Sequence, residues 1–247
     1  MKSVQVCLLL SALCGLSAAL KLPTYIKPCP KDANFNKCAL EHGKAAIPKI
    51  LKGDGKYRIP NMQPLEVEKI VVGDGPDSKI GLQLVCEKCK FYGLEGVQLE
   101  DIKFDFEKKR VFLQGRVPKV QMKGKYKASG KVLVLPITGD GDADINLTNV
   151  GLKYNADFEV EKKNGKDHLK LVNPVLDIET DGINFKLTNL FNGDKLLGDN
   201  MNTFLNENWK ELLKEFGPAV SETLAQIITL IVNNIAELVP YEDVFSH

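Results

Sequence analysis

The residues of this chain with the most distinctive chemistry are its six cysteines. Two of them, Cys7 and Cys14, lie in the first 19 residues, which have the pattern of a cleaved signal peptide. The other four are Cys29, Cys38, Cys86 and Cys89. An even number in a secreted chain predicts two disulfides, with three possible connectivities. The pairing of sequence neighbours is Cys29–Cys38 with Cys86–Cys89. Residues three apart on one strand face opposite sides of a sheet, so the second pair requires a bulge or a turn.

The Cys86-Glu87-Lys88-Cys89 segment has the spacing of a redox-active dithiol. That chemistry requires a thiolate stabilised at a helix N-terminus, whereas this segment follows a strand-like pattern and precedes no helical one. A zinc site requires additional ligands. The three histidines of the chain, which show no ligand spacing, are His42, His168 and His247. We therefore predict no metal and no cofactor.

Asp140, Asp142 and Asp144 imitate the start of a calcium-binding loop. The loop would need glycine where Ile145 stands and glutamate where Gly151 stands, so the acids are better explained as the solvent-facing side of a strand. The chain also lacks the nucleophile-elbow sequence of serine hydrolases. We predict no catalytic residues and do not expect an enzyme.

The N-terminus predicts export from the cell. Lys2 precedes an apolar run, Val4 to Leu16, which is too short to span a bilayer, and small residues at 17–19 suit cleavage. We expect residues 1–19 to be a signal peptide and residues 20–247 to form one secreted domain. Asn146-Leu147-Thr148 is an N-glycosylation sequon that this route would make usable. Removal of Lys2 leaves 32 basic and 32 acidic residues, a balance that argues against nucleic acid and against general attraction to anionic membranes.

The C-terminal stretch from Asp194 to Val239 predicts two long helices in series, joined at Gly217-Pro218, because apolar residues recur there at helical spacing. The second helix is apolar around much of its circumference, so it needs cover on more than one side. Polar residues interrupt it and argue against stable membrane insertion. They are Glu222, Gln226, Asn233, Asn234 and Glu237.

The preceding residues supply that cover. Phe35 to Leu51 predicts a short helix that Pro48 should kink or restart. From about residue 62 to 190, apolar and polar residues alternate in a series of strands, with a turn at residues 73–76 and a one-residue slip at Val150-Gly151 that suggests a bulge. Such alternation is typical of antiparallel sheets with one buried face. The predicted class is α+β, with a long C-terminal helix pair wrapped by a highly curved antiparallel sheet.

Several segments together resemble one known family. They are the Cys29 and Cys38 pair, the helix beginning Cys38-Ala39-Leu40-Glu41-His42, and the C-terminal segments Leu190 to Gly198, Asn206 to Trp209, Gly217-Pro218 and Pro240 to Phe245. The chain resembles the insect takeout and haemolymph juvenile-hormone-binding proteins over nearly its whole mature length. The resemblance implies an elongated tunnel for a hydrophobic ligand, with the N-terminal helix near one end. Cys86 and Cys89 lie outside the family pattern.

We therefore expect a secreted carrier that sequesters a small hydrophobic ligand, such as a terpenoid or a fatty acyl compound. Strand and helix phase suggest Tyr126 and Tyr154 as orienting hydroxyls. The candidate wall residues are Phe104, Phe106, Phe158, Phe204, Trp209 and Ile231. The alternative is a secreted interaction or signalling protein whose core is solid and holds no ligand.

Overall fold

The computed structural model describes residues 20–72 and 81–246. The predicted signal peptide and the predicted turn at residues 73–76 lie outside these ranges. The helices are α1 (Phe35–Ile50), α2 (Lys195–Glu207) and α3 (Trp209–Leu238), with short 3-10 turns η1 (Gly55–Tyr57), η2 (Leu94–Gly96), η3 (Phe191–Gly193) and η4 (Tyr241–Val244). The strands are β1 (Cys29–Pro30), β2 (Leu65–Val72), β3 (Leu82–Tyr92), β4 (Gln98–Asp105), β5 (Arg110–Val132), β6 (Leu135–Lys163), β7 (Lys166–Glu179), β8 (Gly182–Leu187) and β9 (Phe245–Ser246).

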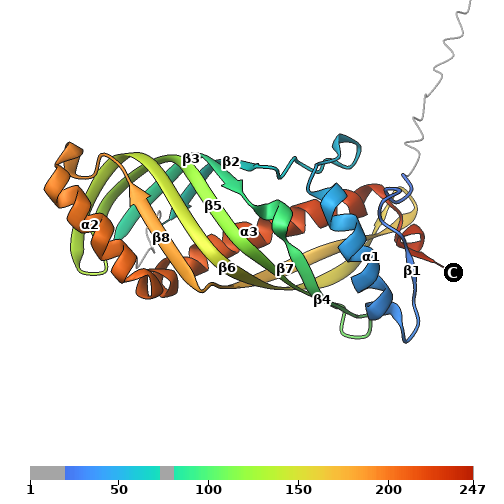
Figure 1. Cartoon of the computed structure of the whole chain (residues 1–247). Coiled ribbons are helices and arrows are strands. Elements are labelled where there is room, and N and C mark those ends of the chain that lie inside the picture. Colours follow the sequence, from blue (N-terminus) through green and yellow to red (C-terminus); the bar gives the residue numbers. More distant parts are fainter. Residues whose placement is uncertain (1–19, 73–80, 247) are drawn as a thin grey trace, which may run out of the picture.

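The predicted α+β class is confirmed, as a single elongated domain. A seven-stranded antiparallel sheet curves around α3, which runs along its length (Figure 1). The two longest strands, β5 and β6, form a central hairpin. One half of β5 pairs with β3 and the other half with β4, while β6 pairs with β7 and β8 in the same divided way. Two long strands therefore form the centre of the sheet. The sequence pattern divided β5 into shorter segments and predicted that β6 continues through a one-residue slip.

The predicted bulge at Val150-Gly151 is wrong, because the pairing of β5 with β6 does not shift register there. β5 and β6 keep one register through this point, with Val117 opposite Val150 and Lys119 opposite Thr148. Instead, the alternation of inward and outward side chains is interrupted at the same point in both strands. In β5 this is shown by Val117 and Val120, which are both buried although they are three residues apart. In β6 the change coincides with Asn149, whose φ of 52° is left-handed. An asparagine tolerates that conformation, so the apolar side chains return to the inner face without loss of pairing.

The predicted helix joint at Gly217-Pro218 is also wrong. The break lies at Asn208 (φ −108°, ψ 25°), and Pro218 lies inside the continuous α3. Asn208 ends α2 by donating from its side-chain nitrogen and its backbone N–H to the carbonyl of Phe204, at 2.8 and 3.0 Å. α2 then lies across one end of the molecule rather than inside the sheet (Figure 1). Pro48 likewise stays inside α1.

Helical asparagines satisfy the backbone of two strands. Asn233 of α3 accepts from the N–H of Leu171 at 2.7 Å and donates to the carbonyl of the same residue at 3.0 Å. Asn206 of α2 does the same with Phe185, at 2.7 and 3.0 Å, and Asn202 binds Leu187 in the same way. Each amide replaces a neighbouring strand, so β7 and β8 present fewer free backbone groups.

α3 also forms part of the outer surface. It packs against β7 on one side and contacts β2 on the other. Its solvent-facing positions include Glu222, Gln226 and Leu230, and Leu230 is 57% exposed. By length and composition, α3 is the one helix of the described residues that could cross a membrane, but here it lies along the inner face of the sheet.

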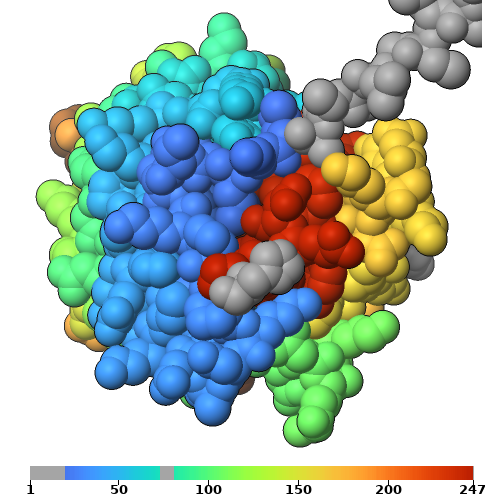
Figure 2. Space-filling view, turned by 90° about the vertical axis from the view of Figure 1, so that its right-hand side faces the viewer, coloured from blue at the N-terminus to red at the C-terminus, as the bar shows by residue number. Residues whose placement is uncertain are grey.

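The opposite end from α2 is closed by both termini of the described chain. β1 pairs in parallel with β9, so Cys29 lies opposite Phe245. The blue N-terminal residues and the red C-terminal residues lie side by side on this end (Figure 2). The Cys29–Cys38 disulfide, with Cα atoms 6.0 Å apart, ties the β1 segment to α1.

Candidate functional site

The interior between α3 and the sheet contains two well-packed clusters. The first lies toward α2 and includes Tyr126, Ala143, Leu190, Met201 and Leu205. The second lies where α3 meets β6 and β7, and includes Tyr154, Phe158, Leu171, Ala225 and Ala236. Members of both are 8% exposed or less. These two regions are solid core.

Other inward-facing residues belong to neither cluster. Met122 of β5 lies opposite Ile145 of β6, on the same sheet face as the buried Tyr126. Both side chains stay partly exposed although strands flank them on each side. Leu213 and Val220 of α3 are also partly exposed, and all four lie outside the packed core clusters. Apolar side chains in central strands normally pack closely, so this middle section of the interior is less tightly filled than the regions on either side.

The two predicted orienting tyrosines are buried, and their hydroxyls already have protein partners. The Tyr126 hydroxyl donates to the carbonyl of Thr188 at 2.7 Å. The Tyr154 hydroxyl lies 2.7 Å from the Thr229 hydroxyl, which itself lies 2.7 Å from the carbonyl of Ala225. Because Thr229 donates its single hydrogen to that carbonyl, Tyr154 is the donor to Thr229. Each tyrosine oxygen keeps the capacity to accept a hydrogen bond.

Burial affects the acidity of both tyrosines. It raises the pKa of Tyr126 to about 12, with the nearby Asp140 carboxylate as a secondary cause. It also raises the pKa of Tyr154. Both phenols are therefore neutral at physiological pH and suited to hydrogen bonding rather than to proton transfer.

Three of the predicted wall residues come together near α1. Phe104 and Phe106 lie 5.9 Å apart between ring centroids, and each lies 6.4 Å from Phe158. Phe35 of α1 packs edge-on against Phe104 and Phe106, at 5.4 and 5.0 Å. The group continues outward to Tyr241 and Phe245. These rings form the inner side of the closed end.

Lys31, which the sequence pattern did not single out, covers this aromatic group from outside. Its ammonium lies 4.0 Å from the ring centroids of both Tyr241 and Phe245. Cation–π contacts of this kind favour a fixed position for the lysine. Lys31 therefore helps to hold the N-terminal segment against the C-terminal one.

The other predicted wall residues are dispersed. Phe204 packs on the cluster toward α2, and Ile231 packs on a third cluster formed by Leu51, Tyr57 and Val239 among others. Trp209 is partly exposed at the start of α3, with the Lys210 ammonium 5.6 Å from its ring, and lies outside the packed clusters. The eight predicted site residues thus do not surround one point.

The sequence pattern identified the Cys86–Cys89 disulfide only as a possibility. The structure contains it, and also the bulge that it requires, between Glu87 and Lys90. Lys88 adopts a left-handed φ of 51°, and this brings both cysteines to the inner face. Cys86 is 6% exposed and Cys89 fully buried.

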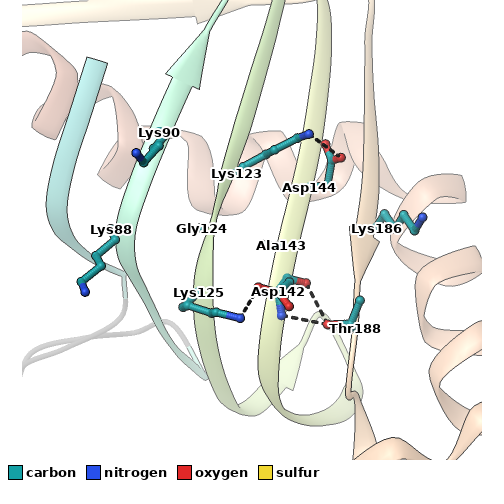
Figure 3. A pocket seen from close by; sticks show the side chains of 10 residues that line it. All are labelled: Lys88, Lys90, Lys123, Gly124, Lys125, Asp142, Ala143, Asp144, Lys186 and Thr188. Carbon is teal, nitrogen blue, oxygen red and sulfur yellow. Dashed lines mark hydrogen bonds and ion pairs between the residues drawn. The ribbon is translucent and has the colours of Figure 1, made fainter. Parts of the chain in front are cut away.

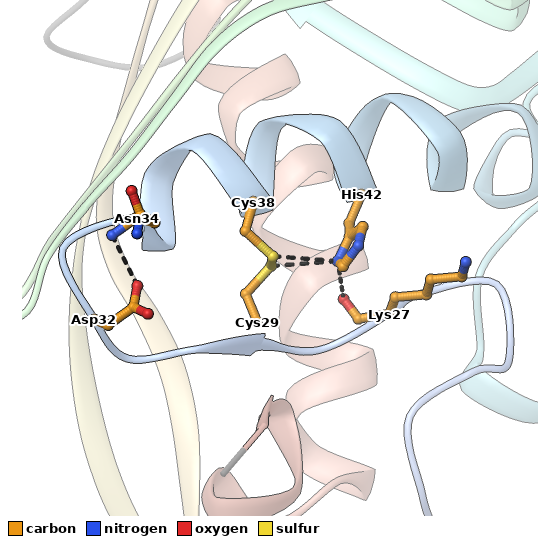
Figure 4. The surroundings of a disulfide bond; sticks show 6 residues. All are labelled: Lys27, Cys29, Asp32, Asn34, Cys38 and His42. Carbon is orange, nitrogen blue, oxygen red and sulfur yellow. Dashed lines mark hydrogen bonds between the residues drawn. A yellow bond between two sulfur atoms is a disulfide. The ribbon is translucent and has the colours of Figure 1, made fainter.

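The Cys29–Cys38 disulfide, also predicted, lies against His42 (Figure 4). The His42 Nδ1 atom is 3.3 and 3.5 Å from the two sulfurs and 3.1 Å from the carbonyl oxygen of Lys27. Within residues 20–72 and 81–246, these three side chains form the one His, Cys, Asp or Glu group compact enough for a metal. Its sulfurs are bonded to each other, so the group cannot act as a thiolate site.

The hollows on the outer surface include two that are lined by described residues. One, of about 490 Å³, lies on the outer sheet face and is lined by lysines and aspartates around Gly124 and Ala143 (Figure 3). Lys123 and Lys125 pair there with Asp144 and Asp142 at 3.8 and 2.5 Å, which fits the solvated strand face predicted from the sequence. The other, of about 550 Å³, lies between α1 and β4. The sequon residue Asn146 is in β6 between Gln121 and Asn184, and its amide donates to Asp144 at 2.9 Å.

Comparisons with known proteins agree with this architecture. The family model described as haemolymph juvenile hormone binding protein matches residues 6–246. The circadian clock-controlled protein daywake of Drosophila melanogaster is 26% identical over 240 residues, covering 94% of this chain and 92% of that protein, and its Drosophila yakuba counterpart is 24% identical over 256 residues, covering 99% and 98%. The crystal structure of Takeout 1 from Epiphyas postvittana is 31% identical in sequence and has a TM-score of 0.79. The match covers 90% of this chain and 100% of that one. Because one family model spans nearly the whole chain and the fold is that of Takeout 1, the chain belongs to the takeout and haemolymph juvenile hormone binding protein family.

Proposed function

We propose that this protein is a secreted carrier that binds a small hydrophobic ligand between α3 and the curved sheet. The observation that carries the proposal is the loosely filled middle of the interior. Met122, Ile145, Leu213 and Val220 face inward, are apolar, and stay partly exposed between two solid clusters. Membership of a family named for binding juvenile hormone supports the same function, and suggests a terpenoid or a fatty acyl chain as the ligand.

The carrier acts by sequestration, without a chemical step. Removing apolar ligand surface from water contributes about 25 cal/mol per Å². A ligand of roughly 20 heavy atoms would gain about 6–10 kcal/mol at ~0.3–0.5 kcal/mol per atom, which corresponds to micromolar or submicromolar affinity. Fixed aromatic and aliphatic walls would hold such a ligand in place.

The buried tyrosines limit which polar groups a ligand can carry. Tyr126 and Tyr154 donate their hydrogens to protein oxygens, so they can offer a ligand only an acceptor. We infer that a ligand hydroxyl or protonated acid group would be favoured beside them. The aromatic group of Phe104, Phe106 and Phe158 would form the wall toward the closed end, and Phe204 and Ile231 would contribute elsewhere along the interior. Trp209 is the weakest of the wall assignments, because it packs on no interior cluster.

Export and glycosylation complete the proposal. Residues 1–19 would direct secretion and be removed, and Asn146 would carry a glycan on the outer sheet face. A carrier of water-insoluble ligands acts in an aqueous compartment, and the two disulfides suit an oxidising one.

Native mass spectrometry of protein from a eukaryotic host, followed by organic extraction, tests the proposal. We expect one lipid-like molecule per chain, and its mass would measure the space available. Protein that is empty and that also fails to bind added terpenoids and fatty acids would contradict the carrier function. It would favour the alternative, a surface-interaction protein with a solid core.

A further inference from the structure

Both cysteines of the Cys86–Cys89 disulfide face the interior, although regular alternation along β3 would place them on opposite faces of the sheet. The inward residues of β3 are Leu82, Leu84 and Cys86, which pair with inward residues of β5. Without the bulge, Cys89 would face solvent. With the bulge, the alternation is reset, and Cys89 and then Phe91 also face inward.

Gly124 makes room for the disulfide. It is the β5 residue opposite the bulge, and a Cβ added there would lie 2.8 Å from Cys86 Sγ and 3.2 Å from Cys89 Cα. A Cβ at this position would therefore require the disulfide or the backbone beside it to shift. A glycine of β5 thus lies opposite the cross-link of β3, where a side chain would not fit.

The disulfide borders the loosely filled section. Cys86 Sγ lies 3.8 Å from the Met122 sulfur, and Met122 is one of the partly exposed inward residues outside the packed clusters. The Met122 thioether thus lies at the edge of this space, and the buried disulfide sulfurs lie directly behind it. They offer no hydrogen bond donor, and sulfur makes favourable contacts with polarisable groups.

From this arrangement we propose that Met122, backed by the buried Cys86–Cys89 disulfide, forms a wall of the ligand chamber, which sets the length of apolar chain that the chamber accepts. The inference rests on the proposed carrier function. The cross-link fixes the wall, because the bulge that holds both sulfurs inward cannot relax while the bond is intact. The favoured ligand is an apolar chain, with unsaturated or isoprenoid segments at this wall.

A length series of saturated fatty acids, tested by displacement of a fluorescent fatty acid, measures the wall directly. Met122→Ala should leave room for about two more methylene groups, and each buried methylene is worth about a fourfold gain in affinity. We expect the preferred length to increase accordingly. The double variant Cys86→Ala with Cys89→Ala should change the preference in the same direction.

Met201→Ala is the matched control, because Met201 is buried in the solid cluster toward α2. It should reduce stability without changing the preferred length, and Met122→Leu should change it little. A native length preference in folded Met122→Ala would overturn the wall assignment. Failure of the unaltered protein to bind any member of the series or an added terpenoid would instead overturn the carrier function, so the two failures are distinguishable.

Oxidation of the unaltered protein provides a second measurement that needs no variant. Hydrogen peroxide should convert Met122 to its sulfoxide in the ligand-free protein, as measured by peptide mass spectrometry. Bound oleate should slow oxidation at Met122 and leave Met201 unaffected. Equal oxidation of Met122 with and without bound oleate would also contradict the proposal.

Discussion

The bidentate contact between Asn233 and the backbone of Leu171 makes a quantitative prediction. The asparagine side chain accepts from the Leu171 N–H at 2.7 Å and donates to its carbonyl at 3.0 Å. Asn233→Ala removes two hydrogen bonds of about 0.5–1.5 kcal/mol each and leaves two partly buried backbone groups unpaired. We expect the free energy of unfolding to fall by about 2–4 kcal/mol. That is a large fraction of the ~5–15 kcal/mol typical of a domain.

Asn233→Asp distinguishes the contributions of the two hydrogen bonds, because it keeps one and removes the other. The carboxylate keeps the acceptor for the Leu171 N–H but faces the Leu171 carbonyl without a hydrogen. The folded state therefore raises the pKa of the new carboxyl above its ordinary value of about 3.9. The stability that the protonated carboxyl contributes is fully present below the unfolded pKa and is lost as the pH rises through the folded pKa. The deficit relative to the unaltered protein should be smaller at pH 4 than at pH 7.

Urea unfolding followed by circular dichroism measures both effects, and the fluorescence of Trp209, the single tryptophan, gives a second probe. Asn234→Ala is the matched control on the same helix, because its amide makes one exposed hydrogen bond, to the carbonyl of Arg58 at 2.9 Å. If Asn233→Ala cost no more than Asn234→Ala, or if Asn233→Asp showed the same deficit at both pH values, the argument that this amide replaces a strand would be refuted.

Three further perturbations test other parts of the molecule. Replacing Cys29 and Cys38 with serine opens a cross-link of sequence separation 9 and should cost about 2–3 kcal/mol in the chain-entropy model, measured as a thermal midpoint below that of the unaltered protein. Tyr154→Phe should lower the free energy of unfolding by about 1 kcal/mol through the lost hydrogen bond to Thr229 of α3. It should also weaken the binding of fatty alcohols and leave the binding of hydrocarbon probes unaffected. An equal loss of affinity for both would contradict the acceptor role. Phe158→Ala empties a site that is 3% exposed and should cost about 3–5 kcal/mol by denaturant unfolding, whereas a loss below 1 kcal/mol would show that the aromatic group is not packed as described.

The errors in the predicted helices have a physical explanation. A proline inside a helix costs about 3 kcal/mol or more in isolation, so Gly217-Pro218 predicts an end. In the folded chain, α3 is held along its length by β7 and the interior clusters, and this packing offsets the local cost. The actual break depends on Asn208 and its contacts with Phe204, which carry no distinctive sequence signal.

The strands show the same division between local and tertiary information. Alternation of apolar and polar residues identified the inner and outer faces correctly, because the side-chain period of a strand is fixed by its backbone. It predicted the change of phase in β6 as a bulge, and it did not reveal that β5 continues through a matching change. That continuity depends on pairing, which keeps Val117 opposite Val150 across the interruption.

The sequence by itself determined the α+β class and the inner and outer faces of the strands, and it offered the pairing of neighbouring cysteines as one of three connectivities, since these follow from periodicity and spacing along the chain. Only the tertiary structure decided which groups face the interior and what they contact. It placed the Tyr126 and Tyr154 hydroxyls on protein partners, and it turned the Cys86–Cys89 disulfide inward beside Met122. It also left a loosely filled section between two solid clusters. These features depend on contacts between residues far apart in the chain, and a local pattern cannot encode which side chains from distant strands and helices fill the same space.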